Sequence, residues 1–272
     1  MLNSIYQALD PVAFSLGPLS VRWYGIAYLL GFICAGVAIY RVARHWKLPL
    51  TLDDVLSLIL GIAFGVILGG RLFYVIFYGA GHYLANPLEI FMLHQGGMSF
   101  HGGLIGALIG GYLACRSLQL DFFTMSDLAA IGAPLGIFFG RIANFINGEL
   151  WGKATDLPWG VVFETGGNVA RHPSQLYEAG LEGLVMFLIL FTLSRKVPPR
   201  YQGTFIGSFI MLYGIFRIIV EFVRIPDAQL GYLFGFITMG QLLSLPLVII
   251  GALILRKAYS AKRPQRTRLA AS

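Results

Sequence analysis

Seven long apolar segments constrain the fold of this chain more than any other feature of its sequence. A helix that crosses a bilayer needs about 20 mostly apolar residues, and the segments have that length. They lie at residues 23–41, 54–78, 98–115, 126–146, 175–194, 203–222 and 236–255. Only 12% of the residues are charged, whereas about a quarter of a soluble domain is charged. The sequence therefore predicts an all-α integral membrane protein: seven transmembrane helices in a single membrane domain over residues 1–272.

The positions of the basic residues predict how these helices are oriented. Most of the 20 Lys and Arg fall in loops that seven crossings place on the side of the C-terminus, and cytoplasmic loops are the ones rich in these residues. We therefore expect an external N-terminus, a cytoplasmic C-terminus and a basic cytoplasmic tail at residues 257–272. Residues 148–174 then form a small external insertion, or cap, between the fourth and fifth helices.

Several other kinds of protein are excluded by the same composition. The two cysteines, Cys34 and Cys115, lie far apart in apolar segments, which is typical of small buried side chains and not of a disulfide framework. The net charge of +7 reflects the orientation in the membrane, because no basic groove with interleaved aromatic residues is present. The sequence also lacks an HExxH motif, and we expect no metal, no other cofactor and no nucleic-acid partner.

Three arginines lie inside the apolar segments, near the ends that we expect to be external. Arg71, Arg141 and Arg217 each cost at least about 2.5 kcal/mol if they face lipid, so such residues normally face protein or water. Guanidinium groups bind phosphate through paired hydrogen bonds, and three of them near one leaflet predict a bound anion. Simpler alternatives remain open. Arg71 can extend to the interface, Arg141 can pair with Glu149, and Arg217 can pair with Glu221 four residues later.

Other polar side chains accompany these arginines. His101 lies between glycine pairs in GGMSFHGGLIG; it can be a packing residue or, since imidazole titrates near neutral pH, a general base. Asn144 shares a helix face with Arg141, and Tyr213 shares one with Arg217. The motif RHPSQLYE adds three polar candidates whose role stays open: His172, Gln175 and Glu178.

Glycines spaced four residues apart predict how the helices pack. Each row lies along one helix face and allows a neighbouring backbone to approach closely. The rows are Gly61, Gly65 and Gly69; Gly102, Gly106 and Gly110; and Gly132, Gly136 and Gly140.

Four motifs together resemble the signature of the prolipoprotein diacylglyceryl transferase family. They are GGMSFHGGLIG (96–106), GRIANFINGELWG (140–152), RHPSQLYE (171–178) and YGIFRIIVEFVRIPDAQ (213–229). The resemblance extends from WYG at 23–25 to MGQLLSLP at 239–246, which is most of the chain. It implies an enzyme that transfers the diacylglyceryl group of phosphatidylglycerol to the lipobox cysteine thiol of preprolipoproteins and releases glycerol phosphate. It also implies a multi-pass protein of the bacterial inner membrane, with its N-terminus, its cap and its active site on the periplasmic side, among membrane lipids.

The resemblance further assigns roles to particular residues. It implies that Arg141 and Arg217 bind phosphate and that His101 is essential. It places supporting, substrate-binding groups at Tyr24, Asn144, Glu149, Gly152, Tyr213 and Glu221, to which we add Arg71 because of its position. Our hypothesis for the reaction is that His101 removes the thiol proton, with Glu149 and Glu221 as weaker candidates for the base.

Two other functions are alternatives to transfer. A transporter or flippase for an anionic lipid also requires arginines in the membrane, but its polar residues should extend through the full depth of the bilayer. Here they gather toward one leaflet. An intramembrane protease would need a catalytic dyad, paired aspartates or a metal motif. The sequence leaves open the base, the route of the lipid, the groove for the peptide, the role of Arg71 and the oligomeric state.

Overall fold

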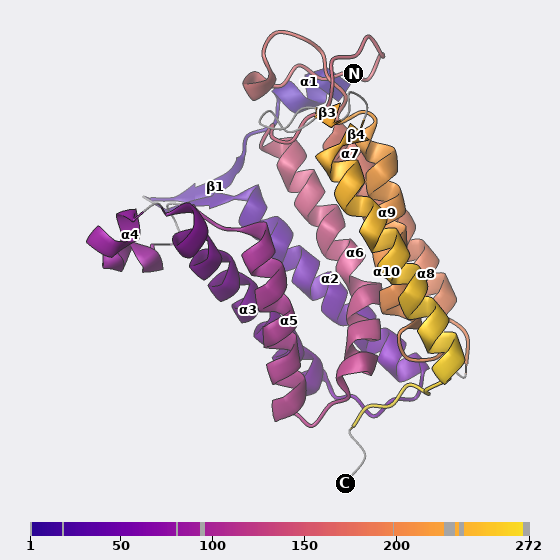
Figure 1. The fold of residues 1–272 in the computed structure, drawn as a ribbon. Helices are drawn as coiled ribbons and strands as arrows, with labels where there is room; N and C mark the ends of the chain where they lie inside the picture. The colour runs from indigo at the N-terminus through magenta and orange to yellow at the C-terminus, as the bar shows by residue number, and fades with distance from the viewer. Residues whose placement is uncertain are drawn as a thin grey trace. The chain divides into compact units, whose positions relative to one another are not determined.

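All seven predicted apolar segments form helices. The computed structural model describes residues 2–17, 19–79, 81–92, 96–197, 199–225, 232–233 and 237–268. The helices are α2 (Trp23–His45), α3 (Leu52–Tyr78), α5 (Phe100–Ser117), α6 (Phe122–Ile146), α7 (Ser174–Glu178) with α8 (Met186–Ser194), α9 (Thr204–Glu221) and α10 (Met239–Ala261) (Figure 1). Between α7 and α8 the chain forms a π-helical segment, η4 (Ala179–Val185), so that Ser174–Ser194 is one long helix.

Six of these helices, among the described residues, are long and apolar enough to cross a membrane. Helix α5 is not among them. The structure thus supports a mostly helical, multi-pass membrane protein, and a seventh crossing by α5 stays a prediction. The remaining elements are short: α1 (Leu2–Gln7), α4 (His82–Ala85), η1 (Pro87–Phe91), η3 (Glu164–Gly166), and two hairpins, β1 (Val12–Leu16) with β2 (Leu19–Arg22) and β3 (Tyr232–Leu233) with β4 (Ile237–Thr238).

The chain divides into two compact units. The first comprises Met1–Trp46 and Ser126–Gln265, and the second comprises Lys47–Met125 and Arg266–Ser272. The single membrane domain expected from the sequence remains a prediction.

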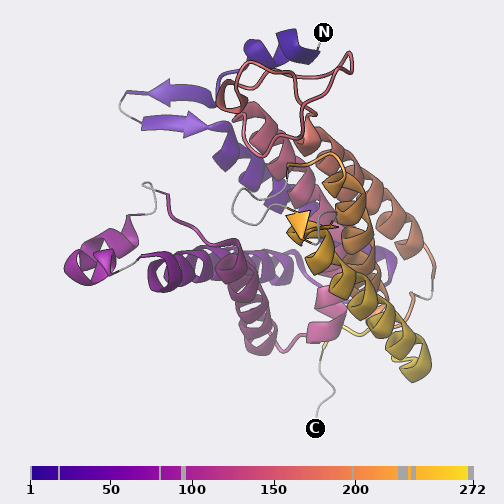
Figure 2. The ribbon, with the colours of Figure 1, turned by 45° about the horizontal axis from the view of Figure 1, so that its top comes forward.

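In the second unit, α3 and α5 pack through their rows of glycine. A Cβ on Gly65 would overlap the carbonyl oxygen of Gly106, and a Cβ on Gly69 would overlap that of Gly102. Both views show the two helices side by side (Figures 1 and 2). The predicted packing role of these two rows is therefore confirmed.

In the first unit, the third row packs only in part. A Cβ on Gly132 would lie 3.0 Å from the Ala35 oxygen of α2, and one on Gly31 of α2 would lie 3.0 Å from the Gly136 Cα. A Cβ on Gly140 meets no described atom within 4 Å. Helices α9 and α10 make a second close pair, since a Cβ on Gly251 would lie 2.7 Å from the Gly207 oxygen.

A buried carboxylate fixes the start of α9. Asp127 of α6 accepts hydrogen bonds from the backbone N–H groups of Gly203 (2.8 Å), Phe205 (3.1 Å) and Ile206 (2.9 Å). The side-chain amide of Gln265 also donates to Asp127, at 2.6 Å. Anionic groups are favoured at this position because the first N–H groups of a helix lack partners within the helix. Helix α10 itself continues to Ala261, inside the predicted tail at 257–272.

The insertion at residues 148–174 is ordered by contacts with α1. The side-chain amide of Gln7 donates a hydrogen bond to the backbone oxygen of Val162, and the backbone N–H of Val162 donates one to the Asn3 Oδ1. Each bond is 2.9 Å long. Tyr6 of α1 also packs in a buried hydrophobic cluster with Phe145, Val161 and Phe163. The N-terminal segment therefore holds the insertion on the end of α6, and its periplasmic position stays a prediction.

Candidate functional site

Arg141 lies in the motif GRIANFINGELWG, near the end of α6. Its side chain projects toward two glutamates of the fifth predicted span. Its Nε lies 3.1 Å from the Glu178 Oε2, and its Nη2 lies 3.5 Å from the Glu182 Oε2. The alternative that Arg141 forms an ion pair with Glu149 is wrong. Among the described residues, Arg141 forms its ion pairs with Glu178 and Glu182.

Two further arginines reach the same carboxylate from α9 and the turn after it. The Nη1 atoms of Arg217 and Arg224 each donate to the Glu178 Oε1 at 2.6 Å. Arg217 also contacts Glu221 through its Nη2 at 3.0 Å, so the predicted i, i+4 pair is present. The Nε of Arg224 lies 3.6 Å from the same Glu221 carboxylate. Six charged side chains thus form one cluster, which we call the arginine–glutamate cluster: Arg141, Arg217, Arg224, Glu178, Glu182 and Glu221.

The carboxylates are the buried part of this cluster. The Glu178 and Glu182 side chains are 0% exposed and that of Glu221 is 5% exposed, whereas those of Arg141 and Arg217 are 20% and 18% exposed. Three positive groups face three negative ones, so the protein itself supplies anions that offset the repulsion among its arginines. A bound anion is therefore not needed to offset that repulsion, contrary to the expectation from the sequence. The partial exposure nevertheless leaves the guanidinium groups open to a ligand.

The π-helical segment η4 positions the two buried glutamates. Glu178 is the last residue of α7 and Glu182 lies within η4. Gly183 makes the contact with α6, because a Cβ there would lie 2.7 Å from the Phe138 Cβ. π-helical turns occur in α-helices mostly as local insertions, and frequently at functional sites.

A second set of polar side chains lies at the end of α6. Asn144 is buried, and its Nδ2 donates to the Glu149 Oε1 at 2.8 Å and contacts the Tyr24 hydroxyl at 3.4 Å. Tyr24 in turn packs against Tyr28, with 5.3 Å between the ring centroids. The backbone oxygen of Glu149 accepts from the Gln175 side chain at 2.6 Å. The structure therefore brings Tyr24 next to Asn144, which lies 120 positions later in the sequence, and to its neighbour Glu149.

Gly152 is needed where the insertion meets the end of α9. A Cβ on Gly152 would lie 2.8 Å from the His172 Cβ and 2.5 Å from the Val223 oxygen. Its N–H donates to the His172 oxygen at 2.8 Å. Burial, followed by the charge of Lys153, lowers the pKa of the His172 imidazole from its ordinary value of 6.5. Gly152 thus has a packing function, whatever its contact with substrate.

Tyr213 and Glu221 flank Arg217 along α9. Tyr213 lies one turn before Arg217 and stacks on Phe209, with 6.3 Å between ring centroids. Glu221 lies against the first turn of α10, because a Cβ on Gly240 would lie 2.6 Å from the Glu221 Cδ. The glycine of the motif MGQLLSLP therefore leaves room for the Glu221 carboxylate against α10.

The second unit contains Arg71 and His101. Arg71 is 4% exposed and donates to four backbone oxygens of the segment that follows α3, those of Glu89, Ile90, Gly96 and Gly97. These bonds give Arg71 a clear structural task, and its contact with substrate stays a prediction. His101 is exposed in the first turn of α5, whose start is capped by Ser99. Its role as base also stays a prediction.

The sequence assigns no role to three members of the arginine–glutamate cluster: Glu178, Glu182 and Arg224. Glu182 was not singled out, although a glutamate in the middle of an apolar span is itself a signal of function. Arg224 shares a helix face with Arg217 and Glu221 by its spacing in the sequence, but that spacing assigns it no role. Glu178 was noted without a role, because nothing in RHPSQLYE shows that arginines from other helices meet it.

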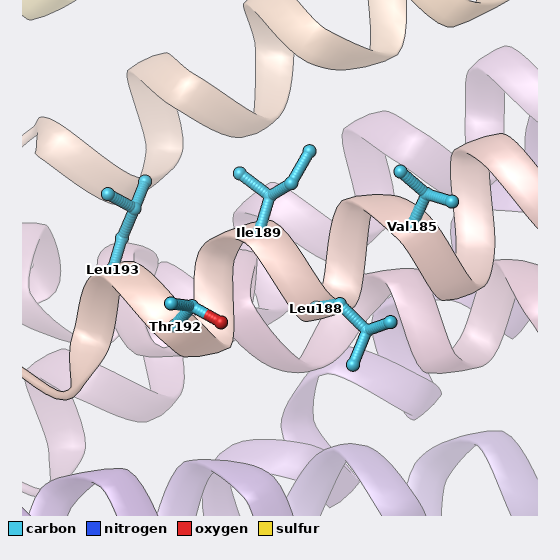
Figure 3. A pocket seen from close by; sticks show the side chains of 5 residues that line it. All are labelled: Val185, Leu188, Ile189, Thr192 and Leu193. Carbon is cyan, nitrogen blue, oxygen red and sulfur yellow. The ribbon is translucent and has the colours of Figure 1, made fainter.

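A shallow depression of about 410 Å³ lies on the apolar side of η4 and α8. It is lined by Val185, Leu188, Ile189, Thr192 and Leu193, which all project from this one helix (Figure 3). Its lining contains no charged side chain. Apolar side chains of this kind suit contact with lipid chains.

Comparison with known proteins identifies relatives over nearly the whole chain. A family model described as "Prolipoprotein diacylglyceryl transferase" matches residues 11–256. A protein of Geobacter sulfurreducens is 52% identical over 246 residues, which cover 90% of this chain and 94% of the relative. One of Methylococcus capsulatus is 49% identical over 259 residues, covering 94% and 98%. Both are named phosphatidylglycerol–prolipoprotein diacylglyceryl transferase.

Proposed function

The chain belongs to the prolipoprotein diacylglyceryl transferase family, and from this premise we propose that it transfers the diacylglyceryl group of phosphatidylglycerol to the lipobox cysteine of a preprolipoprotein. Glycerol phosphate is released, and the product is the thioether that begins bacterial lipoprotein maturation. The enzyme is a transferase of the inner membrane that acts at the periplasmic leaflet without metal or other cofactor. The observation that carries the proposal is the family match together with partly exposed guanidinium groups in the arginine–glutamate cluster.

Arg141 and Arg217 bind the lipid phosphate in this proposal. Each guanidinium has five N–H donors and cannot lose its proton. Arg141 uses its Nε and Nη2 on glutamates, and Arg217 uses its Nη1 and Nη2. Donors therefore remain on both groups for phosphate oxygens, and the exposed fraction of each side chain gives a ligand access to them.

The reaction is a displacement at carbon. The cysteine sulfur of the peptide attacks the glyceryl carbon that carries the phosphate, and a carbon–sulfur bond forms as the carbon–oxygen bond breaks. The electron pair of the broken bond stays on the phosphate oxygen, and the thiol proton passes to His101. A free thiol has a pKa of about 8.5, so a base raises the fraction of the reactive thiolate.

Charge on the phosphate grows as the carbon–oxygen bond breaks. Arg141 and Arg217 therefore stabilise the transition state more than the bound substrate, which is the condition for a faster reaction. Asn144 contacts both Tyr24 and Glu149 at the end of α6, and it follows Arg141 by three residues. We assign these three side chains to holding the headgroup or the peptide. Tyr213, Gly152 and Glu221 support the same region.

Transport of an anionic lipid is the alternative, and the names of the relatives favour transfer over it. The deciding experiment incubates the purified protein with phosphatidylglycerol and a synthetic lipobox peptide. Mass spectrometry should detect the mass increase of a diacylglyceryl thioether, and a peptide whose cysteine is replaced by serine serves as the control. Movement of lipid between leaflets without any thioether would instead support the transporter.

A further inference from the structure

Glu178 is the centre of the arginine–glutamate cluster, although nothing in the proposed chemistry requires a glutamate at this position. Its two carboxylate oxygens contact three guanidinium groups: the Oε1 accepts from Arg217 and Arg224 at 2.6 Å each, and the Oε2 lies 3.1 Å from the Arg141 Nε. No other member of the cluster contacts all three arginines. One carboxylate thus connects α6, α9 and the turn after α9.

The burial of the cluster is asymmetric in a way that matters for binding. The Glu178 side chain is 0% exposed, whereas those of Arg141, Arg217 and Arg224 are 20%, 18% and 13% exposed. The carboxylate therefore lies behind the guanidinium groups, away from solvent, and does not compete for their exposed donors. A carboxylate that accepts several charged hydrogen bonds fixes the geometry of its donors, since such bonds are short and directional.

We propose that Glu178 is a positioning residue that holds Arg141 and Arg217 in one geometry for the phosphate; the inference rests on the proposed transfer reaction. Glu178 does not touch the substrate and acts through the arginines. Glu178 lies at the junction of α7 and η4, near the close contact of Gly183 with Phe138. This position places its carboxylate behind the guanidinium groups.

The effect of losing Glu178 should appear mainly in turnover. Displacements of about 1 Å in a catalytic group can cost on the order of 10²-fold in rate. Glu178→Gln keeps the size of the side chain but removes its charge and one of its two acceptor oxygens. We expect kcat to fall between about 10-fold and 100-fold, with a smaller change in KM for phosphatidylglycerol.

A double-mutant cycle tests whether Glu178 acts through Arg217. If it does, Glu178→Gln should lower kcat much less in the Arg217→Lys background than in the wild type, because residues that act as a unit are strongly non-additive. Equal fold losses in the two backgrounds would overturn the inference. A wild type that forms no thioether would refute the proposed function instead, so the two failures are distinguishable.

Asp127→Asn provides the matched control. Asp127 is another buried carboxylate of the same unit, but its contacts are backbone N–H groups at the start of α9 and the side chain of Gln265. This variant should lower the temperature of thermal unfolding and retain the wild-type kcat. A loss of kcat as large as that of Glu178→Gln would show that burial of a carboxylate, and not its contact with arginine, sets the rate, and would overturn the inference.

A further variant covers the case in which Glu178→Gln does not fold. The double variant Glu178→Gln with Arg224→Gln removes one charge of each sign and so keeps the cluster balanced. We expect it to fold with low kcat, and to lose little more when Arg217→Lys is added. Recovery of the wild-type kcat by the double variant would contradict a positioning role.

Discussion

Replacement of Arg217 by lysine is the sharpest test of the proposed phosphate site. The guanidinium of Arg217 contacts two different carboxylates, with its Nη1 2.6 Å from Glu178 and its Nη2 3.0 Å from Glu221. A lysine has a single nitrogen and no planar fork, so it cannot keep both contacts and also present a second donor to phosphate. The positive charge stays, which limits the damage to the fold.

The size of the effect follows from the bonds that are lost. One charge-assisted hydrogen bond contributes about 1.5–3 kcal/mol, and the side chain is only 18% exposed, so solvent screens it little. If that bond acts in the transition state, kcat should fall by about 10-fold to 150-fold. The assay is thioether formation on the lipobox peptide, measured over a range of phosphatidylglycerol concentrations.

Arg195→Lys is the control for this measurement, because Arg195 is exposed and lies after the end of α8. It should retain the wild-type turnover. Unchanged turnover of purified, folded Arg217→Lys would refute the role assigned to Arg217. A rise in KM alone, with kcat intact, would show that Arg217 binds the ground state and the transition state equally.

Three further predictions concern the rate, the packing and the response to pH. His101→Gln should lower kcat and change the pH dependence of transfer; an unchanged pH profile would show that His101 is not the base. Gly106→Ala should destabilise the protein by about 1–3 kcal/mol or more, because the new Cβ would overlap the Gly65 oxygen, and thermal unfolding in detergent measures this. Burial and Lys153 lower the pKa of His172 in the folded state, so its contribution to stability is complete above pH 6.5 and is lost as the unfolded state takes up a proton below that value. His172→Gln should therefore weaken the fall in unfolding temperature between pH 7.5 and about 5.5, and identical pH profiles of the two proteins would contradict the assignment.

The sequence by itself determined the helices and one of the packing contacts. Apolar length sets which segments become helices, since a backbone within lipid must satisfy its own hydrogen bonds. The glycine spacing of α3 and α5 determined their contact for a similarly local reason, because residues four apart share a helix face. Arg141 and Arg217 were also found locally, since a charge in an apolar segment is conspicuous without knowledge of its partners.

Only the tertiary structure decided which charges meet. Glu178 lies 37 residues after Arg141 and 39 before Arg217 in the sequence, and no helical periodicity relates positions on different helices. The same holds for Arg71, whose partners are backbone oxygens that any sequence carries and that only the path of the chain after α3 brings near. Coulomb attraction acts through distance in space and burial. The sequence therefore supplied the charged groups, and the packing of α6, η4 and α9 made them one cluster.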